Sequence, residues 1–208
     1  VPVSRIDEYL KGRLDPQAEN EILKKLGKSD DTTRAAVRNG TDDALPYRVG
    51  TYSFFSGSGL YFIAGYTNDD VFAALDDAVM SLGYTGIGGK VSSGLGKFSA
   101  FPEEVPEKML KLLTGEHDRY ITLSVSMARD EHLEKALVNA GYMLVKRSGF
   151  INSQTYSDTQ RKKREMYCFA AGSCFENRFE GYVADLSDGG SHPVYRYAVP
   201  MFMGVDLP

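Results

Sequence analysis

Glycines are concentrated at one place in this chain, and this concentration limits how the chain can fold more than any other feature. Six of the fourteen residues from Gly83 to Gly96 are glycine. Glycine has no Cβ atom, so it adopts positive φ angles readily and weakens regular helices and strands. The sequence therefore predicts a loop here, set between the elements that precede it and those that follow.

The composition of this loop also suggests a ligand. Consecutive backbone N–H groups exposed on such a backbone form a concave site for anions. Lys90 and Lys97 add positive charge, and the hydroxyls of Ser92 and Ser93 add further donors. Phosphate is the natural ligand, and the lysines would attract it independently of base sequence. We interpret the loop as a phosphate-binding site; a connecting loop that binds nothing is the alternative.

Two nucleotide-binding patterns do not fit the loop. The Walker pattern ends in Gly-Lys-Ser/Thr, with four free residues after its first glycine. Here Gly96-Lys97 is followed by Phe98, and Val91 occupies the place of the first glycine. The dinucleotide fingerprint needs a strand before its glycines, whereas a predicted helix precedes this loop. An RNA backbone remains compatible with both observations.

Helix signals dominate the start of the chain. A short predicted helix ends near Gly12, and Asp15-Pro16 provides the cap and first residue of a second helix that Gly27 ends. Residues 28–44 are polar and contain turn residues, so we interpret them as an irregular connection. The sequence therefore predicts a helical and irregular junction segment at residues 1–46.

The stretch between this junction and the loop contains a hairpin signal and a helix signal. Aromatic-rich runs at residues 52–55 and 60–66 flank Ser56-Gly57-Ser58-Gly59, which predicts a β-hairpin. Apolar residues at helical spacing then predict a helix that Asn68 or Asp69 caps and Gly83 ends.

The remainder of the chain alternates between helix and strand signals. We predict helices at residues 103–113 and 130–140 and strands at residues 120–126, 142–151, 165–171 and 192–205. This order, together with the hairpin upstream, is typical of an α+β protein. We expect a ferredoxin-like (RRM-like) domain over residues 47–208, with an antiparallel sheet and helices on one face.

Charge and hydropathy narrow the class of protein. The net charge of −4 argues against a nucleic-acid binder, but a basic face can occur within an acidic total. The adjacent cations Arg161-Lys-Lys-Arg164 suit either a solvated turn or contact with phosphates. No apolar run approaches the roughly eighteen residues that span a bilayer, and no signal peptide is present, so we expect a cytoplasmic protein with no membrane partner. Because the sequence begins with Val1 and not with an initiator Met, we also expect a fragment that lacks its N-terminal part.

The sequence predicts neither catalysis nor metal binding. The spacing of Cys168 and Cys174 fits no metal motif, so both are interpreted as small apolar residues in or near strands. Neither His117 nor His132 has an evident acid–base partner, and His192 is expected to stack or hydrogen-bond in the tail. We therefore expect no catalytic residues, no metal ligands and no cofactors.

Three stretches of sequence carry a resemblance to a known family. The loop Gly86-Ile-Gly-Gly-Lys-Val-Ser-Ser-Gly-Leu-Gly-Lys-Phe98 resembles that of the RAMP proteins, the repeat-associated RNA-binding family of CRISPR systems. More closely, it is similar to the fourth subunit of the type III-A (Csm) effector complex. The tail from His192 to Val205 resembles that subunit's closing segment, and Arg38-Asn-Gly-Thr41 resembles its arginine segment. The resemblance covers about residues 34–205.

The resemblance implies a non-catalytic structural role in antiviral defence. Such a subunit holds the 5′ repeat-derived tag of CRISPR RNA and docks against the large polymerase-like subunit and a neighbouring RAMP backbone subunit. It also implies two ferredoxin-like halves, of which this chain would hold the second. The RNA-binding residues that the loop and the resemblance together predict are Arg38, Asn39, Gly86, Gly88, Gly89, Lys90, Ser92, Ser93, Gly94, Gly96, Lys97 and Arg196.

Two other functions stay open at this stage. One is a metal-independent CRISPR repeat endoribonuclease of the same superfamily, whose glycine-rich loop lies near the C-terminus, whereas about 110 residues follow the loop here. The other is a protein-interaction domain in which the loop is only a connector. Co-purified RNA would separate RNA binding from the second alternative.

Overall fold

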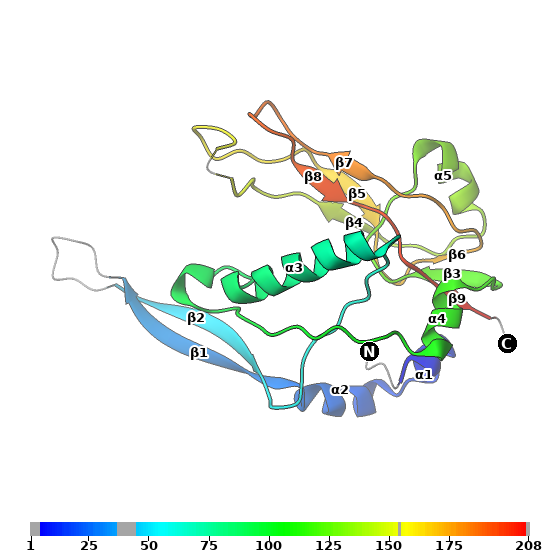
Figure 1. Cartoon of the computed structure of the whole chain (residues 1–208), viewed down its shortest axis with the longest axis horizontal. Helices are drawn as coiled ribbons and strands as arrows, with labels where there is room; N and C mark the ends of the chain where they lie inside the picture. The colour runs from blue at the N-terminus through cyan, green and yellow to red at the C-terminus, as the bar shows by residue number, and fades with distance from the viewer. Residues whose placement is uncertain (1–4, 37–44, 154, 207–208) are drawn as a thin grey trace. The chain divides into compact units, whose positions relative to one another are not determined.

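The structure, a computed structural model of the 208-residue chain, describes residues 5–36, 45–153 and 155–206. It divides into two compact units, Val1–Pro102 (unit 1) and Glu103–Pro208 (unit 2). Both units contain helices and antiparallel strands, which confirms the predicted α+β class (Figure 1).

Unit 1 begins with two short helices, α1 (Ile6–Leu10) and α2 (Pro16–Lys24). The start of α2 agrees with the prediction, because the Asp15 carboxylate accepts hydrogen bonds from two backbone N–H groups of the first turn. The helix ends at Lys24, ahead of the predicted stop at Gly27. Gly27 is instead the first residue of a strand.

A long antiparallel ribbon follows, formed by β1 (Gly27–Ala36) and β2 (Leu45–Phe54) (Figure 1). The irregular connection predicted from residue 28 is therefore wrong for residues 28–36, all of which pair with β2. The sequence pattern missed this strand because the ribbon is almost entirely exposed: Val49 is the single buried residue among its described side chains. A ribbon exposed on both faces needs no apolar alternation, so β1 has no periodic signal.

The predicted hairpin between residues 52–55 and 60–66 is also wrong. Residues 52–54 pair with β1, and residues 60–66 belong to no strand. Residues 60–66 have the aromatic composition of a buried strand, but Tyr61 and Phe62 are exposed. The strand that pairs with β2, over ten residue pairs, is the polar segment β1 upstream of it.

Helix α3 (Asp69–Thr85) leads into the glycine-rich loop. Asn68 caps it as predicted, with its side-chain oxygen accepting a hydrogen bond from an N–H group of the first turn at 3.0 Å. The helix passes the predicted stop at Gly83 and ends before Gly86, whose φ is 90°. Gly83 is buried, and a Cβ there would approach the carbonyl oxygen of Phe98 to 2.6 Å. This glycine therefore serves a close backbone contact rather than a helix end.

Unit 2 contains two helices and seven strands in the part that the structure describes: α4 (Glu107–Thr114), β3 (Arg119–Thr122), α5 (Asp130–Leu137), β4 (Leu144–Arg147), β5 (Met166–Phe169), β6 (Cys174–Phe175), β7 (Val183–Asp185), β8 (Tyr195–Tyr197) and β9 (Phe202–Val205). The predicted helices and the strands near β3, β4, β5 and the tail are confirmed, with shorter bounds. The short strands β6 and β7 were not predicted, and the tail contains two strands instead of one.

The strands of unit 2 form small antiparallel sheets. One has the order β6-β3-β9, and two more are the pairs β4-β5 and β7-β8. A ferredoxin-like fold would place four strands in a single sheet. That finer arrangement is not seen in the sheets that the described residues form.

The core of unit 2 consists of two clusters of buried residues. The first cluster contains Tyr120, Ala128, Ala136, Phe169, Phe175, Phe179 and Phe202. The second cluster contains Met166, Cys168, Leu186 and Ala198. In the first cluster, the rings of Phe169 and Phe175 meet edge to face with centroids 5.0 Å apart, a favourable aromatic geometry.

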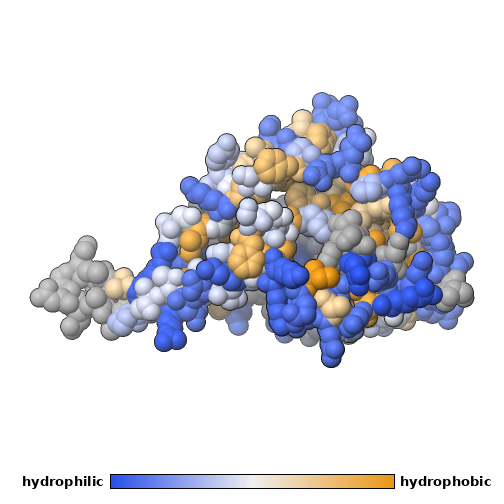
Figure 2. All heavy atoms as spheres, turned by 90° about the horizontal axis from the view of Figure 1, so that it is seen from below, coloured by the Kyte–Doolittle hydropathy of each residue, from blue (hydrophilic) through white to orange (hydrophobic). Residues whose placement is uncertain are grey.

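Unit 1 exposes most of its large apolar side chains. Among the described residues of unit 1, Val49 is the one buried large hydrophobic residue. Its exposed aromatic residues include Phe54, Phe55, Tyr61, Phe62 and Tyr66. Figure 2 shows hydrophobic side chains at the surface among hydrophilic ones. No helix in the described ranges combines the length and the hydropathy needed to cross a membrane.

Candidate nucleic-acid interface

The glycine-rich loop has a base closed by backbone hydrogen bonds. The N–H group of Phe98 donates to the Gly83 carbonyl at 3.2 Å, and the N–H group of Ile87 donates to the Gly96 carbonyl at 3.0 Å. These two hydrogen bonds bring the two arms of the loop together below its tip, residues 88–94. The loop therefore has a defined conformation rather than that of a free linker.

The glycines of the loop serve two different purposes. Gly86 and Gly96 have φ values of 90° and 80°, and a Cβ on either would collide with backbone across the base. Gly88, Gly89 and Gly94 lie at the tip, where a Cβ would meet no atom within 4 Å. The base glycines thus permit close backbone contact, while the tip glycines leave open space beside the backbone.

The tip offers hydrogen-bond donors that the loop itself does not use. Within the described residues, the N–H groups of residues 88–92 donate to no backbone carbonyl, whereas those of Ser93, Gly94 and Leu95 do. The tip also contains a short 3₁₀ turn, Val91–Ser93. Five successive N–H groups thus have no backbone acceptor among the described residues and lie beside open space, and the anion-binding site stays a prediction.

The two lysines of the loop lie in different surroundings. The Lys90 ammonium lies 4.9 Å from the ring centroid of Tyr47, a residue of β2, so the charge is partly anchored by a cation–π contact. Lys97, Ser92 and Ser93 are exposed. The sequence analysis missed Tyr47, because nothing local relates it to a lysine more than forty residues away.

The predicted RNA-binding residues belong to different parts of the chain. Arg38 and Asn39 lie outside the described residues. Arg196 lies in β8 of unit 2, paired with Ala184, and is half-buried. The loop residues from Gly86 to Lys97 form a continuous candidate site in unit 1, and Arg196 belongs to separate surroundings.

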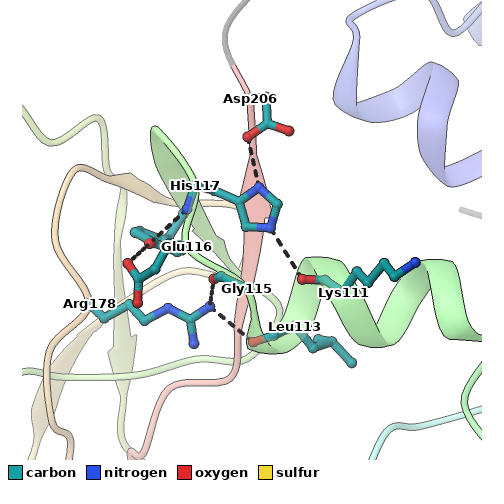
Figure 3. Close-up of polar contacts among 8 residues, drawn as sticks. Lys111, Leu113, Gly115, Glu116, His117, Arg178 and Asp206 are labelled. Carbon is teal, nitrogen blue, oxygen red and sulfur yellow. Dashed lines mark hydrogen bonds and ion pairs between the residues drawn. The ribbon is translucent and has the colours of Figure 1, made fainter.

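His117 has a carboxylate partner, contrary to the prediction that it lacks one. Its Nδ1 lies 2.7 Å from Asp206 Oδ1, and its Nε2 lies 3.2 Å from the Lys111 carbonyl oxygen (Figure 3). The partner escaped notice because Asp206 is 89 residues distant in sequence. A Cβ on Gly204 would fall on the imidazole ring, so glycine makes room for the ring on β9.

These contacts determine the charge of His117. Both partners can accept hydrogen bonds, so the contacts favour the protonated ring, in which both nitrogens donate. The hydrogen bond to Asp206 and then that to Lys111 raise the pKa of His117. A ring held in this way has no free nitrogen with which to accept a proton.

Arg178 lies beside this histidine and, within unit 2, connects the end of α4 to β3. Its guanidinium donates to the carbonyls of Leu113 and Gly115 at 3.0 and 2.9 Å, as Figure 3 shows. It also lies 4.5 Å from the ring centroid of Tyr120. The Arg178 guanidinium therefore connects the end of α4 to the sheet that contains Tyr120.

His192 and the two cysteines also have contacts or positions within the fold that suit a structural role. His192 Nε2 lies 2.9 Å from Ser153 Oγ and its Nδ1 lies 2.9 Å from the Pro193 carbonyl oxygen, which confirms hydrogen bonding in the tail. Cys168 and Cys174 lie in β5 and β6 as free thiols, as predicted. Among the described residues, no group of histidine, cysteine and acidic side chains is arranged to hold a metal ion.

Comparison with known proteins adds a family relationship. The family description "CRISPR Csm4 C-terminal domain" matches residues 115–205. The chain is 38% identical over 205 residues to the "CRISPR system Cms protein Csm4" of Mycobacterium tuberculosis (strain ATCC 25618 / H37Rv), covering 99% of this chain and 66% of the relative. It is 31% identical over 209 residues to the protein of that name from Streptococcus thermophilus, covering 100% of this chain and 65% of the relative. The chain thus spans slightly less than two thirds of the length of these relatives.

Proposed function

Because this chain belongs to the Csm4 family of CRISPR proteins, we propose that it is a non-catalytic RNA-binding subunit of a type III (Csm) CRISPR effector complex. In this proposal the chain holds the 5′ repeat-derived tag of CRISPR RNA. It docks against the large polymerase-like subunit of the complex and a neighbouring backbone subunit. The chemistry on CRISPR RNA or its targets belongs to other subunits.

The geometry of the glycine-rich loop carries this proposal. At its tip the N–H groups of residues 88–92 have no backbone acceptor in the described ranges, open space lies beside Gly88 and Gly89, and Lys90 adds a positive charge. Backbone donors and lysines bind phosphate oxygens without reading bases. A subunit that holds a fixed RNA segment in position needs this kind of contact.

The endoribonuclease alternative receives no support from the histidines. A general base needs a ring nitrogen that is free to accept a proton from the attacking hydroxyl group. Both nitrogens of His117 and of His192 are hydrogen-bonded within the chain. His132 lies on α5 and has a buried Nδ1 without a hydrogen-bond partner among the described residues.

The exposed aromatic side chains of unit 1 support the docking part of the proposal. Phe62 is 66% exposed and Phe101 is 81% exposed, although both are large apolar side chains. Grouped exposed apolar side chains are typical of surfaces that contact other proteins. Protein docking is therefore compatible with RNA binding at the loop, and the two functions need not compete.

Gly89→Val tests the loop site directly. Gly89 does not have a positive φ, and its Cβ would meet no protein atom, so the added side chain disturbs only a ligand at the tip. Gly94 is less suitable, because its φ of 78° would strain any valine. We expect Gly89→Val to weaken binding of tagged CRISPR RNA by about tenfold or more, as measured by filter binding.

Gly59→Val is the matched control, because Gly59 also lies in unit 1 with no atom near its Cβ position and no positive φ. It should bind RNA like the wild-type chain. Unchanged RNA affinity of Gly89→Val, with an unchanged circular dichroism spectrum, would contradict the loop site.

The contribution of Lys90 is tested by its salt dependence. Lys90→Ala should weaken binding to all RNA sequences alike and lower the salt slope by about one counterion. Loss of affinity for only one base sequence would show that Lys90 reads bases. Tagged and untagged RNA titrated at the same salt concentrations provide this comparison.

A further inference from the structure

Two arginines of unit 2 differ from all the others in that unit. Unit 2 contains seven arginines. Four of them donate hydrogen bonds to a carbonyl or hydroxyl oxygen: Arg119, Arg161, Arg164 and Arg178. A fifth, Arg129, forms an ion pair with the Glu180 carboxylate at 3.6 Å. Arg147 and Arg196 form no hydrogen bond and no ion pair with any residue that the structure describes. The Nε atom of each is nonetheless buried.

Both arginines face the second buried cluster. In the β4-β5 ribbon, Arg147 is paired with Met166, which belongs to that cluster. In the β7-β8 ribbon, Arg196 is paired with Ala184, which packs against the same cluster. Residues paired across an antiparallel ribbon share a face, so both arginines extend from the inner faces of their ribbons.

The thiol of Cys168 is influenced by the charges of both arginines. Burial raises the pKa of Cys168, and Arg196 and Arg147 both oppose this rise through their positive charge. Cys168 itself is fully buried in the second cluster. Two cationic groups from different ribbons therefore act on the same small region of unit 2.

This arrangement is unfavourable for the chain on its own. A buried N–H donor without an acceptor loses its hydrogen bonds to water, and two like charges near one point repel each other. In folded proteins, such cations are normally paired with a carboxylate. Here no carboxylate of the described residues is paired with either arginine, and an anion from outside the chain would satisfy both.

The charge around the site favours a polyanion. Residues 142–168 contain six lysines and arginines and two acidic residues, a net charge of +4, whereas the whole chain has a net charge of −4. The segment contains Arg147 and the run from Arg161 to Arg164. An excess of cations on one segment attracts a chain of phosphates more strongly than it attracts one carboxylate.

Exposed aromatic side chains favour RNA over a protein carboxylate. Phe150, three residues after Arg147, is exposed beneath the Lys162 ammonium at 5.3 Å. Tyr195 and Tyr197 are also exposed, but they extend from the outer face of β8, opposite Arg196. Bases of single-stranded RNA stack on exposed aromatic rings next to cationic residues. Arginine is also suited to phosphate oxygens, because its guanidinium donates two parallel hydrogen bonds.

We infer that Arg147 and Arg196 form a two-arginine site in unit 2 that binds a phosphate group of single-stranded RNA, separately from the glycine-rich loop of unit 1. The inference rests on the proposed RNA-binding function and adds a second contact to it. The loop binds phosphate through backbone N–H groups, whereas this site binds it through a pair of side-chain charges.

The double variant Arg147→Gln/Arg196→Gln tests the site in the 208-residue chain. Glutamine keeps much of the length of arginine and removes its charge. We expect RNA affinity to fall by about tenfold and the salt slope to decrease by about 1.4, which corresponds to two counterions of a single strand. The melting temperature should stay unchanged or rise, because the variant removes two unpaired charges from a partly buried position.

The matched control is Lys111→Gln/Arg129→Gln, which removes the same charge from exposed ion pairs of unit 2. Its RNA affinity should change by less than about twofold. The variant Arg147→Lys/Arg196→Lys keeps the charge and loses the two parallel donors, so its affinity should lie between those of the glutamine variant and the wild-type chain.

A spectroscopic measurement identifies the contact itself. The Nε–Hε signals of Arg147 and Arg196, assigned with the single variants, should shift when RNA or inorganic phosphate is added. Signals that stay unmoved by both would overturn the site, as would a double variant that binds RNA like the wild-type chain. A loss of RNA binding that accompanies a marked fall in melting temperature would assign the two arginines a structural role instead.

The outcomes also distinguish this inference from the proposed function. If Gly89→Val loses RNA while the double glutamine variant keeps it, the loop site stands and the two-arginine site fails. If the wild-type chain binds no RNA, the proposed function fails, and the inorganic phosphate titration alone decides whether the two arginines bind an anion. If RNA leaves the signals unmoved but the double variant no longer co-purifies with its partner subunits, a protein carboxylate occupies the site, contrary to the inference.

Discussion

The two units of this chain use their apolar side chains in opposite ways. Unit 2 buries Phe169, Phe175 and Met203 almost completely, whereas unit 1 buries Val49 and leaves its large aromatic residues exposed. The conformation of unit 1 depends on local devices: a helix cap, a ribbon of ten backbone pairs, and glycines at the loop base. The comparison shows that side-chain packing stabilises the conformation of unit 2, whereas backbone hydrogen bonds and helix caps contribute more to that of unit 1.

Core truncation should reveal this difference most strongly. Phe175 is fully buried and its ring contacts Phe169 and Phe179, so Phe175→Ala should lower the free energy of unfolding by about 3–5 kcal/mol. Phe72 on α3 is 37% exposed, so Phe72→Ala should cost less than about 1 kcal/mol. Urea unfolding followed by circular dichroism measures both changes. Equal losses would mean that unit 1 buries its aromatic residues as unit 2 does.

The loop base should be the second most sensitive place. Gly96 has a φ of 80°, and a Cβ there would collide with the Ile87 carbonyl oxygen, so Gly96→Ala should disrupt the base at a cost of about 1–3 kcal/mol. We expect faster hydrogen exchange of the Ile87 amide, with exchange in unit 2 unchanged. Gly89→Ala, which meets no neighbouring atom, is the control and should exchange like the wild-type chain. Slow exchange in both variants would show that the base tolerates a side chain.

The helix caps give a smaller contrast between the units. Asn68 caps α3, so Asn68→Ala should destabilise the helix by about 1 kcal/mol, visible as faster exchange of its first amide protons. Helix α5 of unit 2 starts at Arg129 without a side-chain cap, and it packs by the buried Ala136. Arg129→Ala should therefore leave exchange at the start of α5 unchanged. A similar effect at both helices would contradict the local character of unit 1.

The smallest expected effect is the pH dependence of unit 2. The pKa of His117 is raised in the folded state by Asp206, so this contact stabilises the fold fully below the pKa of the unfolded histidine, near 6.5. The stabilisation is lost as pH rises through the folded-state pKa. With Asp206 largely exposed, we expect a loss of about 0.5 kcal/mol, measured by urea unfolding from acidic to alkaline pH. In Asp206→Asn this pH dependence should be nearly absent; an unchanged slope would mean that another group causes it.

Local signals in the sequence predicted much of the secondary structure. Asp15 and Asn68 identify their helix starts because a cap is made between residues two or three apart. The α+β class followed from the same kind of signal, as did β5 and its buried Cys168. The glycine-rich loop was predictable because a run of glycines excludes regular structure wherever the rest of the chain lies.

Contacts between distant residues were decided by the tertiary structure alone. β1 carries polar residues and is a strand because β2 pairs with it. The predicted hairpin failed because residues 52–54 pair with β1 and residues 60–66 lie in no strand. The partnership of His117 with Asp206 and the position of Lys90 over Tyr47 join residues far apart in sequence. The sequence by itself determined local conformations, because caps, turns and periodicity act within a few residues. The structure decided the partners, because hydrogen bonding and burial depend on which distant segments meet.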